Sequence, residues 1–374
     1  MTYDAIVLGV GGMGSAAVYH LARRGRKVLG IEQFGLAHDQ GSSHGVNRII
    51  RLAYSEDPRY VPLLRRAYEL WRELEVQARE QLLFITGGVD VGPPDGRIVT
   101  GSLRSCIAHG LEHEVLNARE LARRYPGYRL PDELVAVYQS QSGFVMSERA
   151  ILAHVAAARE LGAEVHERER VVEWWPEGRG VAVRTGSYLY KADRLVITAG
   201  PWIGHAVPRL AGVAVPQRQV LIWTQPLRAE YFAVDTFPIF NMEAAEGHFY
   251  GFPAYGVPGF KFGKYHHRCE DTDPDRVNRN IDAEDERVLR EGIQRYFPDA
   301  NGPTLSLKTC LFTNTKDEHF ILDLHPEFEQ VSIASPCSGH GYKFASVVGE
   351  IMADFSIEGG CSKFDLSLFR LGRL

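Results

Sequence analysis

Residues 5–14 read AIVLGVGGMG, and this stretch decides the fold of the N-terminal part of the chain. The apolar run at its start is typical of a buried strand, and it leads directly into the pattern Gly9-x-Gly11-x-x-Gly14. Gly9 permits a tight turn, Gly11 lets the backbone approach a diphosphate, and Gly14 lets a helix pack closely against the strand. The stretch therefore predicts a strand–turn–helix unit that binds a dinucleotide.

The segments after the glycine pattern complete a βαβ unit. Residues 15–25 have helical spacing and end at a glycine, and residues 27–31 form a second apolar run that ends at Glu32. A helix that begins near Gly12 and Met13 directs unpaired N–H groups and a positive dipole end toward a diphosphate. Glu32 can accept hydrogen bonds from a ribose diol and disfavours a 2′-phosphate, so NADP is the least favoured dinucleotide, while FAD and NAD both remain open.

Composition narrows the class of protein. Of the 374 residues, 45% are hydrophobic and 24% are charged, which is typical of a globular protein with a large core. The net charge of −5 argues against nonspecific binding to nucleic acid or to anionic membranes, and no apolar run approaches the length that spans a bilayer. The five cysteines are scattered and form no C-x-x-C motif, which favours a reducing compartment. We therefore expect a cytoplasmic protein with neither a nucleic-acid nor a membrane partner.

The rest of the chain alternates between two kinds of sequence. Residues 81–146 are expected to form strands and turns around one short helix at 117–125, and residues 216–310 are rich in aromatic side chains typical of a second, sheet-rich domain. Between them, an amphipathic helix at 147–162 and strand runs at 163–200 resume the nucleotide-binding part. We expect two interleaved domains, one from residues 1–80, 147–215 and 318–374, the other from residues 81–146 and 216–317.

Two further motifs would predict other chemistry. Residues 41–45 read GSSHG and match the G-x-S-x-G pattern of hydrolases, but that nucleophile needs a preceding strand, and the preceding LAHDQ is not a buried strand. A metal site could draw on five histidine and aspartate side chains, yet their spacing fits neither a helical nor a finger-like ligand set. These five are His266, His267, His319, Asp323 and His325. We therefore expect neither a serine hydrolase nor a metal enzyme.

Four longer stretches follow the glycine pattern in a fixed order. They are GSSHGVNRIIRLAY (41–54), YGFPAYGVPGFKFGK (250–264), CLFTNTKDEHFILDLHP (310–326) and SGHGYKF (338–344). With these stretches the chain resembles, over essentially its whole length, the monomeric sarcosine oxidase family, which includes N-methyltryptophan oxidase and pipecolate oxidase. The resemblance implies an α/β fold in which a glutathione-reductase-like, Rossmann-type FAD-binding domain is interleaved with a mixed-sheet α+β substrate domain.

The resemblance also implies an activity. Such enzymes are monomers that carry FAD, oxidise secondary amines of small amino acids to imines, and pass the electrons to dioxygen to give hydrogen peroxide. The substrate stays open among sarcosine, other N-methyl amino acids, pipecolate, proline and glycated amino acids. Two other functions also stay open: a flavin dehydrogenase that uses an acceptor other than dioxygen, and a flavoprotein that serves in binding or assembly.

The resemblance assigns particular residues to FAD. Cys310 corresponds to the cysteine that links the flavin through its 8α-methyl group, whereas Cys337 lies where the family tolerates other residues. The backbone of residues 338–341 is expected to face flavin N1 and O2, where its positive end stabilises the anionic reduced form. The expected FAD contacts are Gly9, Gly11, Gly12, Met13, Gly14, Glu32, Ser42, Ser43, Arg48, Cys310, Gly339, His340, Gly341 and Lys343.

The resemblance assigns a second set of residues to catalysis. Arg51 and Lys343 correspond to the pair that binds the substrate carboxylate, a task suited to a planar guanidinium fork and a point charge. Lys261 corresponds to the lysine that activates dioxygen near flavin N5, where a fixed ammonium stabilises developing negative charge. The expected catalytic residues are Lys261, Arg48, Arg51, Lys343, His44, which lies near the flavin, and Tyr250, which bounds the substrate pocket.

Four positions near the expected substrate pocket depart from the family's pattern. They are Val46 in place of an acid, Asn47 in place of threonine, Tyr265 in place of histidine, and Phe312 in place of a tyrosine of sarcosine oxidase itself. His266 is adjacent to Tyr265 and could compensate for the missing histidine. We therefore expect the carboxylate-binding pair to be kept, with the natural substrate not fixed as sarcosine.

Overall fold

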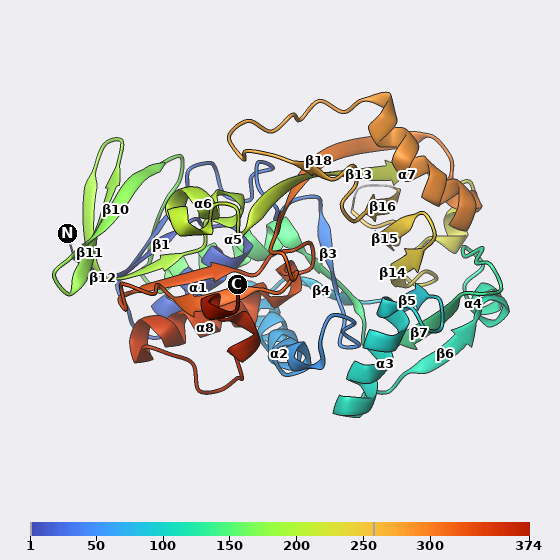
Figure 1. Cartoon of the computed structure of the whole chain (residues 1–374), viewed down its shortest axis with the longest axis horizontal. Helices are drawn as coiled ribbons and strands as arrows, with labels where there is room; N and C mark the ends of the chain where they lie inside the picture. Colours follow the sequence, from blue (N-terminus) through green and yellow to red (C-terminus); the bar gives the residue numbers. More distant parts are fainter. Residues whose placement is uncertain (1, 257–258) are drawn as a thin grey trace.

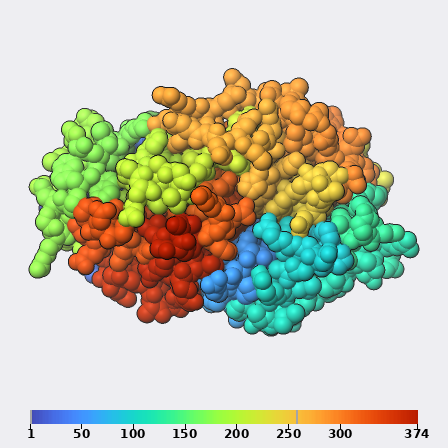
Figure 2. All heavy atoms as spheres, in the orientation of Figure 1, coloured from blue at the N-terminus to red at the C-terminus, as the bar shows by residue number. Residues whose placement is uncertain are grey.

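The strands of the chain form three sheets in the computed structural model, which describes residues 2–256 and 259–374 (Figure 1). Val257 and Pro258, which belong to the stretch 250–264, lie outside the described residues. The space-filling view places the hairpin of strands β10 (Val171–Glu177) and β11 (Gly180–Thr185) at one end of the long axis, and the region of helices α3 (Arg97–His109) and α4 (Ala118–Arg124) at the other (Figure 2).

The first sheet contains the N-terminal βαβ unit. Strand β1 (Thr2–Leu8) pairs in parallel with β2 (Val28–Ile31) and with β12 (Leu189–Ile197). The central strands are largely buried, which explains their continuous apolar sequences. The sheet is completed by β10, β11, β9 (Glu164–His166), β19 (Ile321–Leu324) and β20 (Val331–Ser335). The Rossmann-type arrangement expected from residues 5–32 is confirmed.

Helices from both ends of the chain pack together against this sheet. Helix α1 (Gly12–Arg23) follows the glycine turn, and α8 (Ala345–Glu358) packs directly on α1. The two helices are so close that a Cβ atom added to Gly349 would lie only 2.5 Å from the Cβ of Ala16. The layer also contains α2 (Val61–Ala78) and α5 (Ser147–Glu160). This packing brings the glycine-rich segments before α1 and α8 together, although more than 300 residues separate them in sequence.

The second sheet has nine strands and holds an aromatic core. Its strand order is β17 (Glu270–Asp271), β13 (Val215–Thr224), β16 (Phe260–Lys264), β15 (Gly247–Phe252), β14 (Ile239–Ala244), β5 (Gly88–Gly92), β7 (Val135–Gln139) and β6 (Glu114–Asn117), with β18 (Thr304–Asn314) along β13. Helix α7 (Ala283–Tyr296) covers one face, where Gly292 lies against the rings of Phe249 and Phe262. The other face carries both polar and aromatic side chains, among them Lys261 and Tyr250.

A small third sheet lies near the middle of the long axis in Figure 1. It consists of β3 (Asn47–Ile50), β8 (Gly143–Met146) and β4 (Leu83–Ile85), in that order. Strand β3 follows the irregular segment 33–46 and carries Asn47 and Arg48. A short helix, α6 (Ile203–Ala206), follows β12.

The structure differs from the sequence-based expectation for residues 81–146, because α3 is a second helix there besides α4. The α3 segment, RIVTGSLRSCIAH, contains a glycine in its middle and several β-branched residues, which have low helix propensity. Packing requires the glycine, since a Cβ atom on Gly101 would lie 2.1 Å from the carbonyl oxygen of Ser55. Tertiary packing therefore overrides the local preference of this segment, and the prediction of one short helix is wrong.

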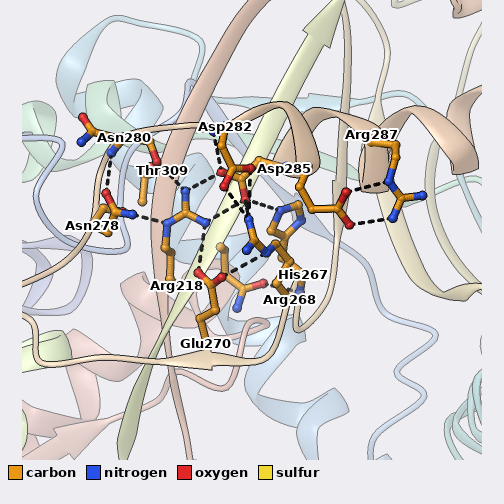
Figure 3. Close-up of polar contacts among 12 residues, drawn as sticks. Arg218, His267, Arg268, Glu270, Asn278, Asn280, Asp282, Asp285, Arg287 and Thr309 are labelled. Carbon is orange, nitrogen blue, oxygen red and sulfur yellow. Dashed lines mark hydrogen bonds and ion pairs between the residues drawn. The ribbon is translucent and has the colours of Figure 1, made fainter.

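A buried ion-pair network anchors α7 to the second sheet (Figure 3). Arg218 on β13 donates two hydrogen bonds to the carboxylate of Asp285, at 2.8 and 2.7 Å, and both side chains are almost fully buried. His267 lies 3.0 Å from the same carboxylate, and Asp282 forms a reciprocal capping box with Asp285 at the start of α7. Burial would raise the pKa of Asp285, but the hydrogen bonds from Arg218 and from the Asp282 backbone hold it well below its ordinary value.

Replacing Asp285 with asparagine is expected to lower the free energy of unfolding by about 3 kcal/mol, because it leaves the buried Arg218 guanidinium without its counter-charge. Unfolding in guanidinium chloride, followed by circular dichroism, measures the change. The control is Glu284→Gln on the same helix, where an exposed pair with Arg287 is removed and the stability should change by less than about 0.5 kcal/mol. Equal stability of the two variants would contradict the role assigned to the network.

Candidate active site

The N-terminal glycine turn has the geometry expected of a diphosphate-binding turn. Gly9 has a positive φ of 88°, and a Cβ atom on Gly14 would lie 1.8 Å from the Gly9 carbonyl oxygen, so both positions need glycine. Gly11 is the N-cap of α1 with no side-chain cap, and a Cβ atom there would meet only Ser43 Oγ, at 3.8 Å. The backbone at the helix N-terminus is therefore open to an anionic ligand.

Glu32 closes the βαβ unit at the carboxyl end of β2. Its Oε2 accepts a hydrogen bond from Val10 N at 2.9 Å, and its Oε1 accepts one from Phe34 N at 3.0 Å. A carboxylate has about four lone-pair positions, so the buried group keeps acceptor capacity for a ribose diol. The side chain lines a cavity that extends from this turn to the second glycine-rich turn, in agreement with its predicted role as a cofactor contact.

A single cavity of about 410 Å³ connects the two glycine-rich turns. Its lining includes most of the predicted cofactor residues, namely Gly9, Gly11, Gly12, Met13, Glu32, Ser42, Ser43, Arg48, Gly339 and Gly341. The other four predicted cofactor residues do not line it: Gly14 packs against Gly9, and Cys310, His340 and Lys343 are buried. Residues from both ends of the chain therefore line one and the same cavity.

The turn at residues 338–341 is tight and is held by His340. Ser338 and Gly339 have positive φ values of 47° and 76°, and a Cβ atom on Gly341 would lie 1.5 Å from the Pro336 carbonyl oxygen. The ring of His340 points to Tyr54, with 2.5 Å between Nδ1 and the hydroxyl, and to the Glu318 carbonyl oxygen at 2.9 Å. Both ring nitrogens of His340 are thus occupied, and the imidazole fixes the turn. A cofactor could therefore contact the backbone of the turn but not this ring.

One face of the second sheet carries most of the remaining site. Side chains alternate between the faces of a sheet, and directly paired residues share a face. Tyr250 pairs with Gly263 on β16 and with Asn241 on β14, and Asn241 pairs with Asp90 on β5. By this register the face carries Cys310 and Phe312 on β18, Lys261 on β16, His248 and Tyr250 on β15, Asn241 on β14, and Asp90 on β5.

Cys310 lies in a cationic corner of this face. Its Sγ is 3.6 Å from Arg48 Nη2, and His44 lies beside the thiol without a well-formed hydrogen bond to it. Burial alone would raise the pKa of Cys310, but His44 and Arg48 lower it to about 6. The thiolate form is therefore favoured at neutral pH. Cys337 lines the cavity, but burial raises the pKa of its thiol to about 11.

Unpaired polar groups near Cys310 show what this corner can accommodate. Both ring nitrogens of His44 and the hydroxyl of Ser42 are buried without a well-formed hydrogen-bond partner among the described residues. Buried polar groups ordinarily have partners, so the corner suits a ligand with several polar atoms. Together with the open backbone at Gly11, these groups fit FAD, which has a diphosphate at its centre and a polar ring system at one end.

Lys261 is buried and fully hydrogen-bonded. Its Nζ donates to the Gly45 carbonyl at 2.7 Å, to the Asn47 carbonyl at 2.8 Å and to Asn47 Oδ1 at 2.9 Å, and it lies over the ring of Phe252. Burial lowers the pKa of Lys261, with Arg48 adding to the effect, whereas three oxygen acceptors favour the ammonium form. The departure at Asn47 is thus explained in part, since its amide oxygen fixes Lys261.

Glu148 is a site residue that the sequence did not reveal. Its carboxylate accepts hydrogen bonds from the backbone of Gly45 at 2.6 Å and of Val46 at 3.1 Å, and it lies at the start of α5. Val46 has a positive φ of 76°, a strained conformation for a β-branched residue. Glu148 therefore holds the strained turn whose Gly45 carbonyl positions Lys261.

Arg51 and Lys343 are brought together over one aromatic ring. They lie 4.8 and 5.3 Å from the centre of the Tyr54 ring, and both are buried. Two carboxylates that the sequence did not reveal neutralise Arg51: Glu56 at 3.1 Å and Asp90 at 3.5 Å. Lys343 makes no ion pair with the described carboxylates and donates to the His340 carbonyl at 2.7 Å. Burial and the nearby Arg51 lower the pKa of Lys343 to about 7.

Aromatic side chains form a wall between these cations and the cavity. The ring of Tyr265 lies 5.2 Å from that of Tyr250 and 5.4 Å from that of Phe312, and its hydroxyl is 3.4 Å from the Gly339 carbonyl oxygen. His266, which could have compensated for the departure at Tyr265, points elsewhere, to Gln217 at 2.8 Å and to Glu318 at 3.1 Å. The histidine stacked on Tyr265 is instead His248, at 3.9 Å.

The other patterns in the sequence have ordinary structural roles. Residues 41–45 lie in an irregular segment, and Ser43 Oγ accepts a hydrogen bond from Gly12 N at 3.2 Å. Asp323 pairs with Arg370, and His319 contacts Tyr60. Within residues 2–256 and 259–374, no group of three or more His, Cys, Asp or Glu side chains is arranged to hold a metal ion. In the same residues, no helix has the length and apolarity needed to cross a membrane.

A βαβ dinucleotide turn, a cavity that joins it to a second glycine turn, and buried cations beside that cavity define the class of a dinucleotide-dependent oxidoreductase. The family described as DAO, FAD dependent oxidoreductase, matches residues 4–355. The chain belongs to this family of FAD-dependent oxidoreductases. The resemblance to the sarcosine oxidases and the expected fold class are confirmed.

Individual relatives cover nearly the whole chain. A monomeric sarcosine oxidase of Streptomyces avermitilis is 42% identical, over 96% of this chain and 94% of that protein. An N-methyl-L-tryptophan oxidase of Salmonella dublin is 36% identical, over 100% of this chain and 99% of that protein. Among solved structures, a Tyr258Phe mutant of NikD, named as an unusual amino acid oxidase essential for nikkomycin biosynthesis, has a TM-score of 0.85 at 23% identity. It covers 99% of this chain and 97% of its own, and it shares the fold.

Proposed function

We propose that the chain is an FAD-dependent oxidase of secondary amines in small amino acids, converting an N-methyl or cyclic amino acid to an imine. The observation that carries the proposal is the pair of buried cations, Arg51 and Lys343, on the Tyr54 ring. Lys343 follows directly after Gly341 and Tyr342, which line the cavity between the glycine turns. A carboxylate-binding pair beside a flavin cavity suits an amino acid as substrate.

The cofactor site divides between the two ends of the chain. The N-terminus of α1 and Glu32 would hold the diphosphate and the ribose, and the turn at 338–341 would hold the flavin end, with a thioether to Cys310. We propose residues 1–80, 147–215 and 318–374 as the FAD-binding domain and residues 81–146 and 216–317 as the substrate domain. When bound, FAD would supply the redox chemistry: it would take one hydride, which carries both electrons, from the carbon next to the amine nitrogen, and two electrons and two protons would then pass to dioxygen to give hydrogen peroxide.

The side chains of the site bind and prepare the substrate. Lys343 supplies the cation for the carboxylate, because Arg51 already shares its charge with Glu56 and Asp90 and serves mainly to align the acid group. An amine must lose its proton before oxidation, since an ammonium has no lone pair. The nearby cations Arg51, Lys343 and Lys261 favour the neutral amine by repelling its charged form. Because Arg51 and Lys343 hold the carboxylate at two points, they align the substrate, which lowers the entropic part of the activation barrier.

Lys261 favours an oxidase over a dehydrogenase. A buried ammonium held by three oxygens is fixed before the reaction, so it can stabilise negative charge that develops on dioxygen without reorganising. We propose dioxygen as the electron acceptor and a monomeric protein, as the sarcosine oxidase relatives' names suggest. The five free cysteines support a reducing, cytoplasmic location.

The decisive experiment is spectroscopic. Purified protein should show a flavin absorption spectrum that stays with the polypeptide after acid precipitation. Under anaerobic conditions, a panel of sarcosine, N-methyl amino acids, pipecolate, proline and a glycated amino acid should include compounds that bleach the spectrum. Air should restore the spectrum with one hydrogen peroxide per turnover. Bleaching without peroxide would indicate a dehydrogenase, and a preparation that no amine bleaches would overturn the proposed function.

A further inference from the structure

His248 lies on β15 of the nine-stranded sheet, on the face that also carries Lys261 and Tyr250. It precedes Tyr250 by two residues on β15, so both side chains lie on the same face. Its ring stacks on Tyr265 with 3.9 Å between ring centres and an angle of 5°. Tyr265 in turn contacts Tyr250 and Phe312, and Phe312 lines the cofactor cavity. His248 therefore lies against the aromatic wall between the cavity and the Arg51 cluster.

A chain of hydrogen bonds fixes which nitrogen of His248 carries the proton. Asn241 Nδ2 donates to Asp90 Oδ1 at 3.0 Å, and a carboxylate can only accept. The amide of Asn241 is thereby oriented with its oxygen toward His248, and the distance from Asn241 Oδ1 to His248 Nε2 is 2.5 Å. The Nε2 atom must donate to that oxygen, so the proton resides on Nε2.

Asp90 is surrounded by groups that favour its carboxylate as an acceptor: Ser102 Oγ donates to it at 2.9 Å, Asn241 Nδ2 at 3.0 Å, and Arg51 lies at 3.5 Å. These groups oppose burial, which is the largest effect and leaves the pKa of Asp90 above its ordinary value. The same carboxylate therefore connects His248 to Arg51 through two side chains. Arg51 and the imidazole of His248 are thus parts of one network of hydrogen bonds and ion pairs.

The other ring nitrogen of His248 is left as an acceptor. Burial lowers the pKa of His248 to about 3, so the ring is neutral and Nδ1 bears a lone pair. No described residue donates a hydrogen bond to Nδ1, which points away from Asn241. A neutral acceptor that is tied to Arg51 through Asn241 and Asp90 suits one feature of an amino acid, its N–H group.

We propose that His248 Nδ1 accepts a hydrogen bond from the N–H of the bound substrate and so determines the class of amine that the site selects. The assignment rests on the proposed function. A secondary amine in its reactive, neutral form keeps one N–H for His248, whereas a tertiary amine has none and would leave Nδ1 unpaired in the complex. Selection for secondary amines thus comes from His248, with Asn241 and Asp90 as positioning residues.

Two rigid acids that do not react provide a direct probe. Pyrrole-2-carboxylate and furan-2-carboxylate share a five-membered ring and a carboxylate, but the first presents an N–H where the second presents an oxygen. Calorimetric titration of the holoenzyme should give a dissociation constant about 10-fold to 100-fold lower for the pyrrole acid. In His248→Phe, which keeps the stacking on Tyr265 but lacks Nδ1, this preference should fall to about twofold or less.

Two further variants separate recognition from structure. His248→Asn places an amide oxygen near the position of Nδ1 and should keep more of the preference than His248→Phe. His266→Asn, next to Tyr265 but directed to Gln217 and Glu318, should keep the full preference. A wild-type enzyme without preference for the pyrrole acid, or a His248→Phe variant that retains it, would overturn the assignment.

The same samples distinguish this inference from the proposed function. If amines bleach the wild-type flavin but the pyrrole preference survives in His248→Phe, only the role of His248 is wrong. If no amine bleaches the wild-type flavin, the proposed function itself fails. As a second readout, the ratio of flavin reduction rates for sarcosine over N,N-dimethylglycine should fall in His248→Phe by the same factor as the ratio of dissociation constants.

Discussion

Replacing Lys261 with methionine is expected to slow the reaction of the reduced enzyme with dioxygen by about 100-fold to 1,000-fold, with a much smaller effect on reduction by the amine. Methionine has nearly the length and bulk of lysine, so the change removes the ammonium and little else. The three oxygens that hold Nζ belong to Gly45 and Asn47. The loss therefore measures the electrostatic stabilisation that a preorganised charge gives to dioxygen as it takes up electrons.

Stopped-flow absorbance measures the two half-reactions separately. Reduction is followed by anaerobic mixing with substrate, and reoxidation by mixing the reduced enzyme with buffers of known dioxygen content. Lys264→Met is the matched control, because Lys264 lies on the same strand but on the opposite face, with its Nζ 5.9 Å from the centre of the Phe249 ring. Equal slowing of both half-reactions in Lys261→Met would show that the residue supports the site as a whole and has no particular role with dioxygen.

The part of the site that the sequence predicted is the part encoded by local pattern. The turn at residues 9–14 follows from glycine spacing between a strand and a helix, and the structure shows why Gly9 and Gly14 cannot carry a Cβ atom. The family resemblance singled out Arg51, Lys343 and Lys261, and all three side chains are buried. Their roles with substrate and dioxygen remain predictions.

The part that the sequence did not predict depends on strand order. Asp90 and Asn241 are 151 residues apart and meet because β5 and β14 pair in parallel. His248 gains its place from the register of β15 against β14 and β16. Each of these side chains looks ordinary in its own segment, and no local pattern shows which strands become neighbours. The adjacent His266 was therefore the natural but wrong choice for a histidine beside Tyr265.

The sequence also did not predict which carboxylates balance the charge of Arg51. An arginine that binds an anion is expected to be free, yet Glu56 and Asp90 already lie within hydrogen-bonding or ion-pair distance of its guanidinium. Removing one buried partner of such a cluster leaves an uncompensated charge and is costly. Because Arg51 already has two carboxylate partners, a substrate carboxylate would depend mainly on Lys343, whose pKa of about 7 makes its charge sensitive to whether a carboxylate is bound.

Replacing Cys310 with alanine is expected to abolish covalent attachment of the flavin, so that acid precipitation leaves all of the colour in the supernatant. The physical reason lies in the thiol's surroundings. His44 and Arg48 lower the pKa of Cys310 to about 6 against the effect of burial, so most of the side chain is thiolate at neutral pH and is nucleophilic. Cys310 lies 3.6 Å from Arg48, which lines the cavity, whereas the pKa of the cysteine that itself lines the cavity, Cys337, is raised.

Cys337→Ala is the matched control for this experiment. Cys337 lines the cavity, yet burial raises the pKa of its thiol to about 11, so it is protonated and poorly reactive. The control should keep all of its flavin on the polypeptide, and mass spectrometry of a tryptic digest should find the flavin on the peptide that contains Cys310. Flavin that stays with Cys310→Ala after precipitation, or leaves only with Cys337→Ala, would move the attachment point. In either case the cationic corner formed by His44 and Arg48 would need another explanation, because its charge would then serve a thiol that does not react.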